Sequence, residues 1–308
     1  MNEAATLPST IADIPRQIPG VTAVEVLVID DGSSDGTAEI ARAAGAEYIL
    51  RFARNRGLGN AFRAGIDRCL ALGADIIVNT DGDNQYFGGD IPRLVTPILD
   101  GQADIVIGDR QPETIHHFSL VKRLLQRFGS RIISLLANAS VPDVASGFRA
   151  YSRAAALRLT TITDFDHTAE HVIQAGRNRF AILSLPIRTN PKLRESRLFD
   201  HAGQFVVKSG LIGLRTYARY KALQVFSAIG LLTFTAGVLL GMRFLYFFFF
   251  TDEGQLHVQS VVLAAVLLLA GFQMVLIGIL SDLIATNRNL LEEVVARLRE
   301  LEGRSSRD

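Results

Sequence analysis

The stretch that decides the fold is residues 24–37, VEVLVIDDGSSDGT. Its first six residues are mostly Val, Leu and Ile, as expected of a strand that is buried in a sheet. Asp30, Asp31 and Gly32 end the strand, and Asp35 or Thr37 is placed to cap a following helix. A buried strand followed by a polar turn and a helix is the repeating unit of a parallel sheet.

Further apolar runs repeat this unit along the chain. Strands are predicted at residues 47–50, 74–79 (ADIIVN), 103–107 (ADIVI) and 182–187. Helical patterns lie at residues 37–44, 58–72, 91–99, 122–137, 154–159 and 168–175. Strands that alternate with helices form a mostly parallel sheet with helices on both faces. The predicted fold class is therefore α/β, with ligands expected beyond the carboxyl ends of the strands.

The composition argues against some classes of ligand and indicates the redox environment of the protein. The chain has 308 residues and a formal net charge of +1, so no overall positive field indicates a nucleic-acid ligand. Its single cysteine, Cys69, can form no intramolecular disulfide, which suits a reducing compartment. Cys69 lies in a helical pattern and is interpreted as a small core residue.

A second acidic turn, Asp81-Gly82-Asp83, comes after the predicted strand at 74–79. Two carboxylates one residue apart on a glycine turn can both reach one hard cation, and Gln85 adds a neutral oxygen. Mg²⁺ or Mn²⁺ held there would bridge the diphosphate oxygens of a nucleotide. Taken alone, such a turn is more often a solvated acidic loop than a metal site.

The first acidic turn also has two interpretations. A helix cap explains Asp35 and Thr37, but it does not explain two further carboxylates, Asp30 and Asp31, at the end of a strand. An aspartate there can hydrogen-bond the base or ribose of a nucleotide. Because both acidic clusters follow strands of one predicted sheet, together they indicate a nucleotide site.

Four segments occur in a characteristic order: DDGSSDGT at 30–37, NRGLGNAFRAG at 55–65, DGDNQ at 81–85 and SGFRA at 146–150. This set resembles the family 2 glycosyltransferases of GT-A fold. Within them it is similar to dolichyl-phosphate mannose synthases and bacterial polyprenyl-phosphate glycosyltransferases. The resemblance covers about the first 200 residues and implies a nucleotide-sugar donor and a polyprenyl-phosphate acceptor.

The resemblance also implies roles for individual residues. The implied donor-binding residues are Glu3, Asp30, Asp31 and Asp81, and the implied metal ligands are Asp81, Asp83 and Gln85. The implied acceptor-phosphate contacts are Ser146, Arg149 and Arg197, the last within a segment, 194–198 (RESRL), that has Arg194 where the family has Gly. Asp81, Asp83 and Arg149 are the predicted catalytic residues.

The sequence departs from the family at its start. The family begins with a buried strand that ends in Pro-x-x-Asn-Glu, whereas this sequence opens at Met1-Asn2-Glu3. We expect that strand to be absent from the sheet, through a misplaced start codon or a trimmed sequence. Its neighbours would then have unpaired edges, which leaves the placement of Glu3 open.

A predicted helix at 122–137 carries a basic face formed by Lys122, Arg123, Arg127 and Arg131. Such a face is commonly solvated. Near a membrane it can instead attract a lipid phosphate. Arg131 is the favoured acceptor-phosphate residue because it lies nearest in sequence to Ser146.

The last third of the chain predicts a membrane anchor. The expected parts are a catalytic domain at 1–203, a juxtamembrane amphipathic helix at 204–221, transmembrane helices at 222–250 and 258–285, and a C-terminal helix and tail at 286–308. Lys and Arg flank the two spans but are absent from the loop at 251–257, and no secretory signal opens the sequence. A multi-pass plasma-membrane protein with both termini and the catalytic domain in the cytoplasm is expected.

The predicted reaction is inverting transfer of a sugar from a UDP- or GDP-linked donor to a membrane polyprenyl phosphate, to supply cell-envelope glycan. A processive polysaccharide synthase is disfavoured because the chain has no tryptophan for that group's Gln-x-x-Arg-Trp motif. A sugar-phosphate nucleotidyltransferase and an inactive remnant are further alternatives. Whether the apolar stripe of Leu290, Leu291, Val294, Leu298 and Leu301 packs on the domain or on a partner chain stays open, and a homo-oligomer is one possible assembly.

Overall fold

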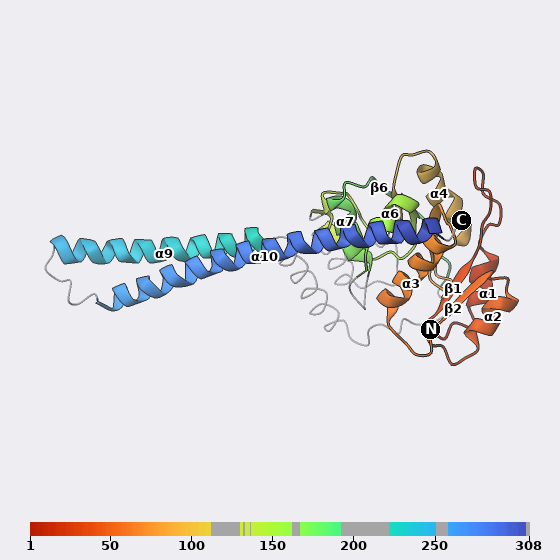
Figure 1. Ribbon diagram of the computed structural model, residues 1–308, viewed down its shortest axis with the longest axis horizontal. Coiled ribbons are helices and arrows are strands. Elements are labelled where there is room, and N and C mark those ends of the chain that lie inside the picture. Colours follow the sequence, from red (N-terminus) through yellow and green to blue (C-terminus); the bar gives the residue numbers. More distant parts are fainter. Residues whose placement is uncertain are drawn as a thin grey trace. The chain divides into compact units, whose positions relative to one another are not determined.

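The computed structural model describes residues 1–111, 130–131, 133–135, 137–161, 167–191, 222–250 and 258–305 (Figure 1). The chain divides into two compact units. One comprises Met1–Gly210 together with Glu292–Asp308, and the other comprises Leu211–Leu291. The predicted juxtamembrane helix at 204–221 lies outside the described residues.

In the described part of the first unit, six strands form two sheets. They are β1 (Leu27–Asp30), β2 (Tyr48–Arg51), β3 (Ile76–Asn79), β4 (Ile105–Asp109), β5 (Arg149–Ser152) and β6 (Ile182–Pro186). β1 and β2 pair in parallel, and the second sheet has the order β3-β5-β4-β6.

In the second sheet, β3, β4 and β6 run in the same direction, as the sequence predicted, and β5, which the sequence did not predict, runs against them. β5 runs antiparallel to both β3 and β4, while β4 and β6 are parallel. The segment RAYS at 149–152 did not predict a strand because it opens with an arginine and has no run of β-branched residues. The predicted α/β class itself is confirmed.

Helices cover these strands where small side chains permit close approach. They are α1 (Leu7–Ala12), α2 (Thr37–Ala43), α3 (Leu58–Ala71), α4 (Ile91–Leu99), α6 (Arg153–Arg158) and α7 (Thr168–Arg177). A Cβ at Gly65 on α3 would lie only 3.2 Å from the side chain of Ile29, so glycine lets this helix approach β1 closely. The hydroxyl of Ser152 caps α6 by accepting a hydrogen bond from the N–H of Ala155 at 3.2 Å.

Among the described residues, two hydrophobic clusters support the unit. The larger one includes Leu94, Val106, Phe148 and Ala150, all fully buried. A smaller one contains Leu7, Ile11, Ala41 and Ala46, with Val28 of β1 packed against it. The two acidic turns therefore follow strands that rest on different cores.

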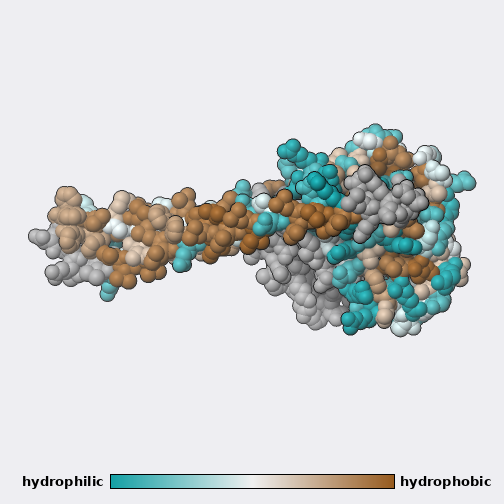
Figure 2. Space-filling model, in the orientation of Figure 1, coloured by the Kyte–Doolittle hydropathy of each residue, from teal (hydrophilic) through white to brown (hydrophobic). Residues whose placement is uncertain are grey.

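The second unit contains α9 (Ala222–Phe250) and the greater part of α10 (Val258–Ser305), which lie alongside each other (Figure 1). Both are long and apolar enough to cross a membrane, over Leu223–Phe250 and Gln259–Asn287. Most of their residues are exposed, and Figure 2 shows a mainly hydrophobic surface over the pair. α10 continues without a break past residue 285, where the sequence predicted the second span to end.

Candidate active site

The Asp81-Gly82-Asp83 turn follows β3, as the sequence predicted. Asn84 adopts the left-handed conformation (φ 57°), and Oδ1 of Asp83 accepts a hydrogen bond from the N–H of Gln85 at 3.1 Å. The carbonyl of Gln85 is in turn bonded to the N–H of Asn190 at 2.9 Å. These bonds give the turn a defined shape close to the end of the strand.

The structure brings this turn against the distant SGFRA segment. A Cβ at Gly147 would lie 3.2 Å from Oδ1 of Asp81, so a glycine there keeps the carboxylate unobstructed. Asn79, the last residue of β3, donates its side-chain N–H to the carbonyl of Gly147 at 2.7 Å. The hydroxyl of Tyr86 accepts from the N–H of Gly147 at 3.0 Å. The predicted metal-binding and acceptor-binding segments are therefore in contact.

Electrostatics single out Asp81. Burial, followed by the negative charges of Asp83 and Glu3, raises the pKa of Asp81 to about 6, and the positive charge of Arg110 only partly opposes this shift. The same surroundings raise the pKa of the Tyr86 hydroxyl to about 12. A carboxylate in an excess of negative charge is a place where a bound cation would be stabilised.

Glu3 lies beside the same turn. Its N–H donates to the hydroxyl of Thr37 at 3.2 Å. The hydroxyl of Thr6 lies 3.1 Å from Oε2 of Glu3 and 2.8 Å from the carbonyl oxygen of Gly82. The N-terminal residues thus connect the two acidic turns, and the open question of where Glu3 lies is answered by its position next to Gly82.

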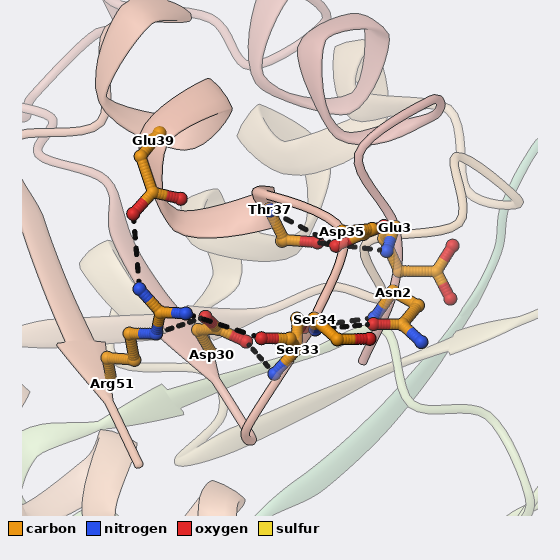
Figure 3. Close-up of polar contacts among 9 residues, drawn as sticks. All are labelled: Asn2, Glu3, Asp30, Ser33, Ser34, Asp35, Thr37, Glu39 and Arg51. Atoms are coloured by element: carbon orange, nitrogen blue, oxygen red, sulfur yellow. Dashed lines mark hydrogen bonds and ion pairs between the residues drawn. The ribbon is translucent and has the colours of Figure 1, made fainter. Parts of the chain in front are cut away.

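The turn after β1 is held by hydrogen bonds within the chain (Figure 3). Asp30 is 1% exposed; its Oδ1 accepts from a main-chain N–H of the turn at 2.9 Å and its Oδ2 lies 3.3 Å from Nε of Arg51. Asp31 accepts from the N–H groups of Arg56 and Gly57 at 2.7 and 3.1 Å. Both predicted donor-binding carboxylates therefore hold loops in place at this edge.

Arg149 occupies a different position from the one predicted. It is 0% exposed, and its guanidinium donates to the main-chain carbonyls of Val144, Ser146 and Thr168 at 2.6, 2.8 and 2.9 Å. All three nitrogens are occupied by the chain, so the predicted contact with an acceptor phosphate is not supported. Arg149 instead fixes the segment that carries Ser146, which is itself fully buried.

Of the other basic side chains discussed as phosphate contacts, the structure describes Arg131 alone. Arg131 is exposed, and its role as a phosphate ligand stays a prediction. Arg197 and the basic residues Lys122, Arg123 and Arg127 lie outside the described residues.

Arg110 is a charged site residue that the sequence analysis missed. It follows β4, and its Nε and Nη2 donate to the two carboxylate oxygens of buried Asp143 at 2.7 and 2.9 Å. This ion pair raises the pKa of Arg110 although burial alone would lower it. Its positive charge acts on Asp81 and Tyr86, so it belongs to the site. The sequence feature that could have identified Arg110 is its position directly after a predicted strand.

The residues present fit a divalent cation that is shared with a ligand. In the described part of the chain, no three His, Cys, Asp or Glu side chains converge to form a complete metal cage. Mg²⁺ in phosphate-transfer sites is commonly held by one or two carboxylates together with oxygens of the substrate. The Asp81 and Asp83 turn provides that kind of incomplete donor set, and the neighbouring carboxylate of Glu3 adds to the negative charge there.

The chain is similar in sequence to several proteins named as sugar transferases. Glycosyltransferase AglJ of Haloferax volcanii is 29% identical over 98% of this chain and 95% of its own length. The dolichyl-phosphate hexose transferase of the same organism is 30% identical over 68% of this chain and 89% of its own. The undecaprenyl-phosphate mannosyltransferase of Micrococcus luteus is 31% identical over 51% of this chain and 65% of its own length.

A solved structure supports the fold. Glucosyl-3-phosphoglycerate synthase from Mycobacterium tuberculosis, in complex with Mn²⁺, UDP and phosphoglyceric acid, superposes with a TM-score of 0.51 and 24% identity. The similarity covers 69% of this chain and 75% of that one, and it confirms the predicted GT-A fold. The family model described as glycosyl transferase family 2 matches residues 1–159, and this chain belongs to that family.

Proposed function

We propose that this protein transfers a sugar from a UDP- or GDP-linked donor to the phosphate of a membrane polyprenyl phosphate, with inversion at the anomeric carbon. The observation that carries the proposal is the contact between the Asp81 turn and the Ser146–Gly147 segment. It occurs in a family 2 glycosyltransferase domain whose chain continues into two candidate membrane spans. Relatives named for transfer to dolichyl or undecaprenyl phosphate support the choice of acceptor.

Asp81 and Asp83 would hold Mg²⁺ or Mn²⁺, with Gln85 as a further oxygen ligand. The cation, when bound, supplies positive charge to the departing nucleoside diphosphate. Glu3 lies beside Gly82, where it adds to the negative potential that raises the pKa of Asp81. Its proposed role is to orient the donor at this turn.

Asp30 and Asp31 would contribute to nucleoside binding by holding two loops in position. Asp31 fixes the N–H groups at the start of the 55–65 segment, and Asp30 fixes the turn at 32–34. A nucleoside base would then be recognised by these loops and by any carboxylate edges that remain accessible. Hydrogen bonds already in place before the donor arrives reduce the reorganisation that its binding requires.

The part of the site that binds the acceptor phosphate would require positive charge, and a general base would not be essential. A phosphate monoester is partly dianionic near neutral pH, since its second pKa is about 6, and is itself the nucleophile. Arg110 provides fixed positive charge close to Asp81, while Arg149 fixes the segment of Ser146 and Gly147. Arg131 and Arg197 are proposed to contact the acceptor phosphate. Catalysis would then consist of positioning and charge stabilisation.

The two spans would keep the catalytic unit at the surface where the lipid head group lies, which raises the effective concentration of the acceptor. Basic residues beside the spans and none in the 251–257 loop support a topology with both termini in the cytoplasm. On this proposal the protein is a multi-pass membrane enzyme.

The test is transfer of radiolabelled sugar from a panel of UDP- and GDP-sugars to a short-chain polyprenyl phosphate by the purified full chain. Reactions contain Mn²⁺, Mg²⁺ or EDTA. The proposal expects labelled lipid from one donor class, abolished by EDTA. Labelled product that elongates into polymer would indicate a processive synthase. Release of diphosphate from a nucleoside triphosphate and a sugar phosphate would indicate a nucleotidyltransferase.

A further inference from the structure

α9 and α10 pack through one face of each helix, by small residues. A Cβ at Gly271 would lie 2.6 Å from the main-chain nitrogen of Phe234 and 2.7 Å from the carbonyl oxygen of Gly230. A Cβ at Gly237 would lie 3.1 Å from the carbonyl oxygen of Ala264. Glycines at these positions allow the two backbones to touch, so this face of α10 is occupied within the chain.

The opposite face of α10 carries a second regular pattern. Residues at alternating spacings of four and three form a row along one side of the helix, and all are exposed: Val262, Val266, Leu269, Gln273, Leu276 and Leu280. We call this row the outer seam. A spacing of 3.5 residues is the repeat with which one helix packs along another. Gln273 and Gly271 are separated by about 200° around the helix axis, so the outer seam faces away from α9.

Gln273 is the unusual member of the outer seam. It lies midway along the candidate span Gln259–Asn287, which places it about 21 Å from either end. The hydrocarbon core of a bilayer is about 30 Å thick, so its amide lies near the membrane centre when the helix spans the bilayer. An amide facing lipid there has no water to bond, and polar groups in membrane helices ordinarily face protein.

We propose that the outer seam is the interface of a parallel homodimer in which Gln273 of each copy hydrogen-bonds Gln273 of the other. The inference rests on α10 spanning the membrane, as in the proposed function, but not on the sugar-transfer reaction. Two copies inserted with the same topology are related by an axis along the membrane normal. That axis sets residue 273 opposite residue 273.

The choice of a second copy follows from complementarity. A carboxamide carries a partly positive N–H and a partly negative oxygen, so two identical amides satisfy each other in both directions. An isoprenoid chain fits the apolar residues of the seam but offers nothing to the amide. Gln259 and Asn287 are also exposed and lie fourteen residues before and after Gln273. The same register would therefore bring three amide pairs together.

The first experiment is oxidative cross-linking in native membranes. Cys69, the single cysteine, is replaced by serine, and single cysteines are then introduced at Leu276 on the outer seam or at neighbouring Val275, which contacts Gly230 of α9. The proposal expects a disulfide-linked dimer from Leu276→Cys and little from Val275→Cys, because a disulfide requires Cα atoms about 4.4–6.8 Å apart. Equal yields from the two positions would overturn it.

The second experiment tests the amide itself. The dimerisation constant is measured by energy transfer between labelled copies as the lipid-to-protein ratio is varied. Gln273→Leu should weaken the dimer roughly three- to twentyfold, whereas Gln273→Asn, which keeps an amide, should retain more of the association. An unchanged constant in Gln273→Leu would overturn the proposal. Sugar transfer is measured on the same samples. The dimerisation constant then tests the interface and the transfer rate tests the proposed reaction, so that either proposal can fail without the other.

Discussion

Replacing Asp81 with asparagine should make the metal-free protein more stable at neutral pH, although it removes a proposed metal ligand. The folded state raises the pKa of this carboxyl from 3.8 to about 6, mainly through burial and then through the charges of Asp83 and Glu3. Ionised Asp81 is therefore destabilising in the fold. Asparagine has nearly the same shape and carries no charge.

The magnitude follows from the size of the shift. About two pKa units correspond to roughly 3 kcal/mol as an upper limit, at 1.36 kcal/mol per unit. For a domain of this size, 1 kcal/mol moves Tm by about 2–4 °C, so Asp81→Asn should raise Tm by up to roughly 6–12 °C. Binding sites commonly carry such a cost in the absence of their ligand.

The pH dependence identifies the cause. A carboxyl whose pKa is raised in the folded state binds more protons there than in the unfolded state. Its destabilising effect is therefore absent below about pH 4, grows as the pH rises toward 6, and is complete above it. The Tm difference between Asp81→Asn and wild type should follow this course. Asp100→Asn, at an exposed position after α4, should show no such difference.

The assay is thermal unfolding of the full chain in detergent, followed by circular dichroism between pH 4 and 8, with EDTA. Adding Mn²⁺ should then raise Tm of the wild type more than Tm of Asp81→Asn, because a ligand stabilises the state that binds it. An equal or lower Tm for Asp81→Asn at pH 7.5, or a difference independent of pH, would show that the ionised carboxylate of Asp81 does not destabilise the fold.

Three further changes test the packing. Arg110→Gln removes the bidentate partner of buried Asp143 and should lower the free energy of unfolding by about 3–5 kcal/mol in urea titrations. Arg299→Ala should lower it by about 1–3 kcal/mol, because this side chain contacts α3 and the end of α6, whereas Arg297→Ala, which loses only an exposed pair within α10, should change it by less than about 0.5 kcal/mol. Gly176→Ala should sharply reduce Tm and the yield of folded protein, since the added methyl group would overlap the main-chain carbonyl oxygen of Ala137.

The elements that the sequence predicted well are those with a strong local signal. The apolar runs gave β1, β3 and β4, and the acidic turns that follow β1 and β3 lie where predicted. The long apolar stretches gave α9 and the first part of α10. In each case the residues that decide the element are neighbours in sequence, so periodicity and composition suffice.

The parts that escaped prediction depend on partners far away in the chain. β5 is a strand because it fits between β3 and β4, which supply hydrogen bonds on both of its edges. Arg149 is buried because three carbonyls from two segments surround its guanidinium. Arg110 meets Asp143 across 33 residues. An arginine in a functional motif has the same local sequence whether it contacts a phosphate or the chain's own main chain.

The role of the Asp81–Asp83 turn in sugar transfer is tested by comparing three purified full-length proteins with polyprenyl phosphate and Mn²⁺: wild type, Asp83→Asn and Asp100→Asn. Both substitutions remove one carboxylate, but only Asp83 lies on the turn beside Asp81. We expect at least about a 100-fold loss of transfer in Asp83→Asn and near wild-type transfer in Asp100→Asn. Full metal-dependent transfer by Asp83→Asn would contradict this role of the turn.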